Sequence, residues 1–170
     1  MRTGILTFHR AHNCGAMLQC YALQTVLTRM GHDVSILDCN RIGEEHRFQS
    51  IGRCSLKRYV KKFLEFLLSL GAYDLRMYRF NAFRRRHIRM TKPIGLQDKF
   101  PKEYDYYIIG SDQVLQPNLT KEYRQTFLLG RVEEDCKKLS YAASFGYSSL
   151  PEEFRSEYRD ALARFKQLMI

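Results

Sequence analysis

The stretch "GILTFHRAHNCGAMLQCYALQTVLTRMGHDVSILD" (residues 4–38) contains the pattern that decides the fold. Its first five residues, 4–8, form a short apolar run and predict a buried strand. Apolar side chains then recur at helical spacing over residues 16–30, and Gly31 follows as a natural end for that helix. Residues 33–39 predict a second strand. A strand, a helix and a strand within about 40 residues form a βαβ unit, in which the strands run parallel and the crossover is right-handed.

Three later segments also predict strands. "YDYYIIG" (residues 104–110) is rich in aromatic and β-branched residues, "TFLLG" (residues 126–130) predicts a short strand, and "KKLSYAASFG" (residues 137–146) runs from a strand into a glycine-ended turn. Residues 150–170 predict a helix with Pro151 near its first turn, and the final "LMI" suggests the lead-in to another element. The predicted class is therefore α/β, with a Rossmann-like parallel sheet and flanking helices.

Residues 53–92 predict a basic helical insertion between the second and third strands. The segment contains twelve Lys or Arg and two acidic residues, so its excess of positive charge equals the net charge of +10 of the whole chain. Its second helix is predicted over residues 73–87, with three apolar anchors: Tyr78, Phe80 and Phe83. A basic surface can bind nucleic acid, an anionic membrane or an acidic small substrate. The alternative is that these helices pack on their own domain and leave the cations in water.

Composition argues against several classes of protein. No apolar run reaches the roughly 18 residues of a membrane span, and residues 1–8 lack a signal peptide's apolar stretch, so we expect a cytoplasmic location. The five cysteines form no C-x-x-C pair, so we expect free thiols and no bound metal. The G-x-G-x-x-G fingerprint and the Walker A lysine are both missing, which argues against a standard dinucleotide site and a P-loop.

Polar residues cluster where three of the predicted strands end. Open parallel sheets bind ligands beyond the carboxyl ends of their strands. We therefore predict one substrate site that includes the following residues of the three turns: His9, Asn13, Gly15, Gly110, Ser111, Asp112, Gln113, Ser144, Phe145 and Gly146. Gln19, one turn into the first helix, reaches the same edge, whereas Gln24 is expected on the surface.

Each of these residues also has a purely structural interpretation. The backbone N–H groups near Gly15 suit a phosphate or carboxylate, but Asn13 could satisfy the same donors as a plain N-cap. His9 and His12 could act as acid–base groups, or they could be ordinary loop histidines. Asp112 could orient a sugar hydroxyl or accept its proton, or it could simply cap a turn.

Four motifs together resemble the polysaccharide pyruvyl transferase family. They occur in the family's order and at plausible spacing: "NCGAMLQCYALQ" (residues 13–24), "GHDVSILD" (31–38), "YDYYIIGSDQVLQPN" (104–118) and "KKLSYAASFG" (137–146). "RFNAFRRRHIRMT" (residues 79–91) is similar to that family's basic helix before the third strand. The resemblance implies a GT-B-like architecture of two Rossmann-like halves facing a cleft. It further implies that residues 1–170 form the N-terminal half, and that the donor-binding C-terminal half is absent from this chain.

The resemblance also implies a reaction. Family members transfer the enolpyruvyl unit of phosphoenolpyruvate to a sugar, which forms a pyruvate ketal and releases phosphate during exopolysaccharide, capsule or cell-wall glycan synthesis. No cofactor is implied. The expected partners are a sugar acceptor (a nucleotide- or lipid-linked sugar or a glycan), a C-terminal half encoded downstream, and a membrane surface touched by the basic helices; nucleic acid is not expected. The alternative is an inactive truncated half, or a module that binds sugar nucleotides or glycans.

Residues carried over by motif fall into three groups: Asn13, Gly15 and Gln19 line the cleft at the first helix, Ser111, Asp112 and Gln113 line it at the third strand, and Ser144, Phe145 and Gly146 close one side. We expect them to bind the acceptor more than the donor. Asp112 is the best catalytic candidate, since the residues that grip phosphoenolpyruvate lie largely in the family's second half. Position 115 departs from the family, because Leu115 stands where Trp is usual and the chain has no Trp. Tyr106, Tyr107 or Phe145 could replace that aromatic ring.

Overall fold

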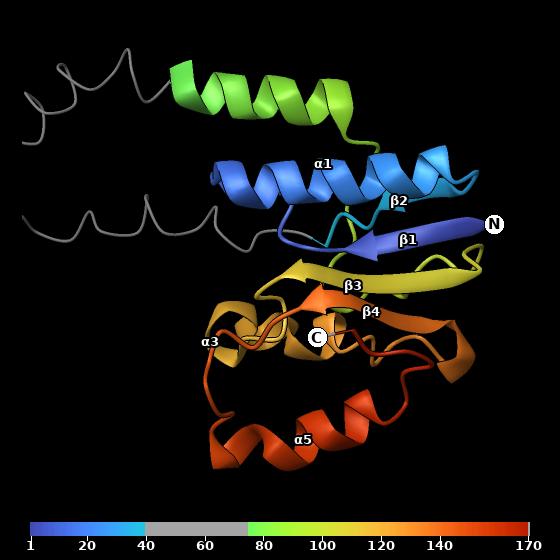
Figure 1. Cartoon of the computed structure of the whole chain (residues 1–170), viewed down its shortest axis with the longest axis vertical. Helices are drawn as coiled ribbons and strands as arrows, with labels where there is room; N and C mark the ends of the chain where they lie inside the picture. Colours follow the sequence, from blue (N-terminus) through green and yellow to red (C-terminus); the bar gives the residue numbers. More distant parts are fainter. Residues whose placement is uncertain (40–74, 170) are drawn as a thin grey trace, which may run out of the picture.

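The computed structural model describes residues 1–39 and 75–169 (Figure 1). Four strands form one sheet: β1 (Arg2–Leu6), β2 (Asp33–Ile36), β3 (Tyr106–Asp112) and β4 (Lys138–Ala143). They lie in the order β2-β1-β3-β4, and every neighbouring pair is parallel. Helical segments are α1 (Cys14–Arg29), a helix at residues 75–87, α3 (Pro117–Thr120), η1 (Lys121–Tyr123), α4 (Arg124–Phe127), η2 (Asp135–Lys137) and α5 (Glu152–Leu162). The predicted α/β class is confirmed.

Helices cover both faces of the sheet. In Figure 1, α1 and the helix at residues 75–87 (green) lie on one side, and α3 and α5 lie on the other. Successive residues of a strand point to opposite faces, so neighbours enter different cores. Ile5 and Ile108 belong to the core beneath α1, whereas Leu6 and Ile109 belong to the core on the α5 side. Burial on both faces explains why the central strands are apolar almost throughout.

Helix α1 begins and ends as the sequence predicts. Asn13 is its N-cap, and the Asn13 side chain accepts a hydrogen bond from the Gly15 backbone N–H at 2.8 Å. Gly31 follows the C-cap Met30 with a φ of +87°, a backbone conformation that glycine adopts without strain. The crossover helix of the βαβ unit is therefore capped at both ends by the residues that the sequence provides.

The helix at residues 75–87 agrees with the described part of the predicted insertion; residues 53–74 of that prediction lie outside the described residues. Phe80 is buried and packs with the core beneath α1, and Phe83 is half-buried against Tyr21. Tyr78, predicted as a third anchor, is 65% exposed, so that prediction is wrong. Tyr78 lies on the exposed side of this helix, and Phe80 and Phe83 make the contacts with α1 and its core.

Gln24 is buried, contrary to the prediction that it lies on the surface. Its amide nitrogen donates to the His87 carbonyl at 3.2 Å, and its amide oxygen accepts from the Arg89 backbone N–H at 2.9 Å. The side chain therefore bonds the backbone that follows the helix at residues 75–87. Helical periodicity alone cannot reveal a distant backbone segment of this kind.

Two predicted elements near the C-terminus also need correction. Residues 126–130 are not a strand. Arg124–Phe127 is helical, and Phe127, Leu128 and Leu129 are buried in the core where this short helix ends. Helix α5 ends at Leu162, earlier than predicted. The chain then runs beside β4, where the Ser140 N–H donates to the Gln167 carbonyl at 2.9 Å. Residues 166–169 thus run parallel to β4 as an extended segment.

Within residues 1–39 and 75–169, no helix is long and apolar enough to cross a membrane.

Candidate functional site

The strand order places a topological switch point between β1 and β3. From β1 the chain crosses through α1 to β2 on one side, whereas β3 and β4 lie on the other side of β1. Open parallel sheets bind ligands at the carboxyl ends of the two strands that flank such a switch point. The residues just after β1 and β3 therefore form the centre of the candidate site.

Three side chains form a closed ring of hydrogen bonds at this switch point. The Gln19 amide nitrogen donates to Thr7 Oγ1 at 2.8 Å, and Thr7 Oγ1 donates to the Ser111 carbonyl at 3.2 Å. Ser111 Oγ donates back to the Gln19 amide oxygen at 2.8 Å. This brace, made by Thr7, Gln19 and Ser111, joins β1, α1 and β3. It brings together Gln19 and Ser111 as predicted, and it adds Thr7, which the sequence reading missed.

Gly110 allows the turn after β3 to pack against β4. Its φ is +112°, and a Cβ atom at this position would lie 2.0 Å from the Tyr141 carbonyl oxygen. One residue pair further along, the Ser144 backbone N–H donates to the Asp112 carbonyl at 2.9 Å. Only glycine fits this contact, so Gly110 supports the geometry of the site and offers no side chain to a ligand.

Asp112 lies at the carboxyl end of β3 and is half-buried. Its Oδ1 accepts a hydrogen bond from the Gln113 backbone N–H at 2.8 Å, so the turn-capping interpretation is confirmed. In the described part of the chain, Asp112 makes no ion pair with a Lys, Arg or His. Its carboxylate therefore retains acceptor capacity, and a contact with a ligand hydroxyl stays a prediction.

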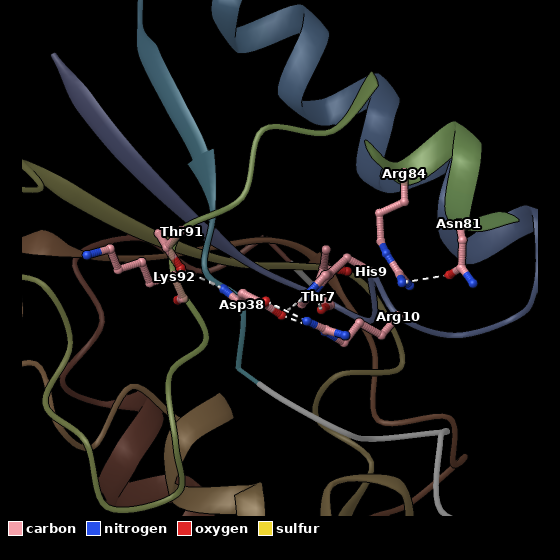
Figure 2. A network of polar contacts seen from close by, with 8 residues as sticks. All are labelled: Thr7, His9, Arg10, Asp38, Asn81, Arg84, Thr91 and Lys92. Carbon is pink, nitrogen blue, oxygen red and sulfur yellow. Dashed lines mark hydrogen bonds and ion pairs between the residues drawn. The ribbon is translucent and has the colours of Figure 1, made fainter. Parts of the chain in front are cut away.

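Asp38 is the other carboxylate at this edge, and it is fully engaged (Figure 2). Arg10 Nε and a terminal Arg10 nitrogen each donate to the Asp38 carboxylate at 2.6 Å, and His9 Nε2 lies 2.8 Å from Asp38 Oδ1. Burial disfavours the charged form of Asp38, but the hydrogen bonds from Arg10 and His9 outweigh it and hold the pKa of this carboxyl well below its usual range. Asp38 is therefore a structural anion at neutral pH.

His9 belongs to this buried cluster and not to an open turn. Its side chain is only 2% exposed, and its Nδ1 lies 3.0 Å from the Thr7 carbonyl. The predicted direct contact of His9 with substrate is therefore replaced by a contact with Asp38. His12 packs its ring against Phe80 at a centroid distance of 6.0 Å. A carboxylate at the end of a buried strand, as Asp38 is, was the sequence signal that could have revealed the cluster.

The first turn holds the remaining predicted residues as a helix cap. Asn13 and Gly15 are both exposed, and the Asn13 side chain already accepts from the Gly15 N–H. The N-cap interpretation of Asn13 is thus confirmed. Whether this turn also contacts a ligand stays a prediction.

The turn after β4 lies against the turn after β3. The Leu115 N–H donates to the Ser144 carbonyl at 3.1 Å, and the Gly146 N–H donates to Ser144 Oγ at 3.0 Å. Gly146 has a φ of +68° and lies close to the Gln113 side chain, since a Cβ atom on it would be 3.0 Å from Gln113. The structure therefore brings Gln113, Ser144 and Gly146 together, as predicted.

The aromatic candidates differ in position. Leu115 is fully buried, so no ring at 115 faces the edge. Tyr107 is buried and donates its hydroxyl to the Pro101 carbonyl, while Tyr106 lies at the start of β3, beneath Lys166. Only Phe145 remains at the carboxyl edge, half-buried against Tyr158 at a ring distance of 5.7 Å.

The cysteines near this edge differ in exposure, because Cys14 is exposed in the first turn whereas Cys20 and Cys39 are buried. Burial raises the pKa of both Cys20 and Cys39 to about 12, so neither is a thiolate at neutral pH. Within residues 1–39 and 75–169, no three His, Cys, Asp or Glu side chains are placed to hold a metal ion. A hollow of about 560 Å³ between α1 and the helix at residues 75–87 is mainly apolar, and none of the predicted site residues lines it.

The fold and the edge define a class: an α/β domain with a four-stranded parallel sheet and a candidate ligand site at its topological switch point. Residues 13–170 match the family model of polysaccharide pyruvyl transferase, so the chain belongs to that family. No curated protein matches the chain, and no solved structure matches it. Family membership implies pyruvyl transfer in polysaccharide biosynthesis, which is the activity of a transferase.

Proposed function

We propose that the protein transfers the enolpyruvyl group of phosphoenolpyruvate to a sugar diol, and that the carboxyl edge of β1, β3 and β4 holds the acceptor. Family membership supports the reaction class. The single observation that supports the acceptor assignment is Asp112, a half-buried carboxylate at this edge that makes no ion pair within the described residues. A sugar hydroxyl needs an acceptor of this kind to lose its proton.

The proposed reaction balances in atoms and charge. One sugar hydroxyl oxygen bonds to the central carbon of the donor, whose methylene carbon gains a proton and becomes a methyl group. The second hydroxyl oxygen bonds to the same carbon, and the bond from this carbon to the phosphate oxygen breaks. The two hydroxyl protons end on the methyl group and on the released phosphate. Asp112 takes the proton from the attacking hydroxyl and so acts as a general base.

The donor is assigned to another part of the enzyme. Phosphoenolpyruvate has a carboxylate and a phosphate, which call for several cationic partners. At the described edge Arg10 is engaged by Asp38 in two hydrogen bonds, which leaves it poorly suited to that role. We therefore assign the donor to a facing second half, in a GT-B-like arrangement. Under this proposal the enzyme works in the cytoplasm, needs no cofactor, and touches the membrane, if at all, through its basic helix at residues 75–87.

A second candidate is a glycan-binding half without turnover. The same observation about Arg10 favours it, because an acceptor site without donor cations binds but does not react. The two candidates differ in one product, which is inorganic phosphate.

The test uses protein isolated from the cell that makes it, through an affinity tag at residue 1, so that any partner half remains bound. Phosphoenolpyruvate labelled with carbon-13 at its methylene carbon is added together with the glycolipid and sugar-nucleotide extract of that cell. The proposal predicts phosphate release and a new methyl signal on a glycan, both dependent on the extract. Phosphate release without the extract, or no release with it, would contradict the proposal, and the second outcome would favour the binding half.

A further inference from the structure

We propose that Tyr147, together with the side-chain amides of Gln113 and Gln116, forms the subsite that holds the acceptor's sugar ring beside Asp112. This proposal rests on the proposed transfer to a sugar, and it deepens that proposal by naming the surface that contacts the ring. The site residues predicted from the sequence include neither Tyr147 nor Gln116, although Gln116 lies within the motif at residues 104–118. Both residues emerge from the way in which the turns after β3 and β4 meet.

Tyr147 presents an aromatic face at the carboxyl edge. It follows Gly146 in the turn after β4 and is 37% exposed. The Asn118 amide nitrogen donates to its hydroxyl oxygen at 2.8 Å, which links the ring to α3. Because the hydroxyl serves as the acceptor in this bond, its own proton stays available for a ligand. The ring is thus positioned from two segments and remains open on its exposed side.

Two amides lie next to Gly146, the residue directly before Tyr147. A Cβ atom on Gly146 would be 3.0 Å from the Gln113 side chain and 3.1 Å from Gln116 Nε2, so both amides pack against the Gly146 backbone. Among residues 1–39 and 75–169, neither amide group has a hydrogen-bond partner. Each offers one acceptor and two donors, the combination that pairs with neighbouring sugar hydroxyls.

The subsite is contiguous with the proposed base. Gln113 follows Asp112 directly, and its backbone N–H bonds the Asp112 carboxylate at 2.8 Å. The Asp112 carbonyl in turn accepts from the Ser144 N–H, three residues before Tyr147. The proposal therefore places one hydroxyl of the bound sugar at the Asp112 carboxylate.

The physical basis is the amphipathic nature of a sugar. Its C–H face is weakly positive and packs on the negative face of an aromatic ring, while its hydroxyls bond planar polar groups at the rim. Leu115 is buried and Tyr107 points into the core, so neither of these positions can supply that face.

The experiment measures saturation transfer by NMR from the full 170-residue chain to three probes: methyl β-glucopyranoside, methyl β-galactopyranoside and methyl β-mannopyranoside. We expect transfer to the ring protons of at least one probe. Tyr147→Ala should lower it about fivefold or more, and Tyr147→Phe, which keeps the ring, should retain at least half of it. Tyr78→Ala, which removes another exposed tyrosine from a different element, should leave the signal unchanged, and circular dichroism confirms that each variant is folded.

Two results would overturn the subsite: no transfer to any of the three probes, or equal transfer to the original chain and to Tyr147→Ala. Neither result depends on phosphate release, so the subsite and the proposed transferase fail separately. Binding that Tyr147→Ala abolishes, in a protein that releases no phosphate, would support the subsite and contradict the transferase. Phosphate release that Tyr147→Ala leaves intact would contradict the subsite and support the transferase.

Discussion

Gly110 is the residue whose replacement should damage the site most directly through the backbone. A methyl group there would meet the Tyr141 carbonyl oxygen at 2.0 Å, and the φ of +112° is unfavourable for any other residue. Gly110→Ala should lower the free energy of unfolding by about 3 kcal/mol, because backbone of a neighbouring strand cannot move aside cheaply. Urea unfolding followed by circular dichroism measures this change.

The matched control is Gly31→Ala. Gly31 also has a positive φ, of +87°, but a Cβ atom on it would meet nothing within 4 Å. Gly31→Ala should lower the free energy of unfolding by only about 1 kcal/mol, because it adds backbone strain without a steric clash. Equal losses for the two variants would show that the contact between Gly110 and Tyr141 is not tight.

Asp38 should make stability depend on acid. Its pKa is lowered in the folded state, so its stabilising effect is complete above the unfolded value of about 4 and is lost as the pH falls toward the lower folded value. Asp38→Asn should destabilise the protein by about 3 kcal/mol at pH 7, because it leaves Arg10 and His9 without their anion. The difference in free energy of unfolding between Asp38→Asn and the original protein should shrink as the pH falls from about 4 to about 2.

Thermal unfolding at a series of pH values checks this prediction. Asp160→Asn is the control, since the Asp160 side chain is 74% exposed and its substitution should change little at any pH. A gap between Asp38→Asn and the original protein that stays constant down to pH 2 would contradict the account.

At the residue scale, the sequence identified which side chains matter more reliably than it identified the groups to which they hydrogen-bond. Asn13 and Gly31 were predictable because caps act within one turn of their own helix. His9 and Gln24 were misjudged because their partners, Asp38 and the backbone around His87, lie 29 and 63 residues away along the chain. A pattern within a few neighbouring residues cannot reveal contacts between residues that lie so far apart along the chain.

At the element scale, the brace should couple α1 to the two central strands. Thr7→Val removes the hydroxyl and leaves the Gln19 amide and the Ser111 carbonyl short of a partner, so it should cost about 2 kcal/mol. Thr7→Ser keeps the hydroxyl and should cost less than about 1 kcal/mol. A double-mutant cycle of Thr7→Val with Ser111→Ala should give a coupling energy above about 0.5 kcal/mol. Strict additivity in urea unfolding would show that the ring of hydrogen bonds does not act as a unit.

Helices and strands with a clear periodicity of apolar residues were predictable, whereas the secondary structure of short apolar runs was not. Helix α1 and strands β1 and β3 have unambiguous patterns, and they form as expected. "TFLLG" at residues 126–130 is five residues long, and a buried strand and a buried helical turn look alike at that length. The pairing of residues 166–169 with β4 was likewise not encoded locally, since it depends on where α5 returns the chain to the sheet.

At the scale of the whole molecule, parallel topology explains why the site could be located before its geometry was known. Parallel strands present their carboxyl ends on one edge, so the turns after β1, β3 and β4 had to lie together. The sequence could not show which side chains at that edge bond each other and which stay available. Gln19 and Ser111 satisfy one another, whereas Asp112 and Gln113 keep polar groups open to a ligand.

In the proposed reaction, Asp112 activates the hydroxyl of a sugar acceptor at this edge. The most direct test compares phosphate release from phosphoenolpyruvate by the natively isolated protein and by its Asp112→Asn variant, with the cell's own acceptor extract and with Asp160→Asn as the control. Asp112→Asn should release phosphate at least about 100-fold more slowly, with unchanged thermal stability. Asp160→Asn should keep full activity. Phosphate release by Asp112→Asn at the rate of the original protein would contradict the proposed role of Asp112.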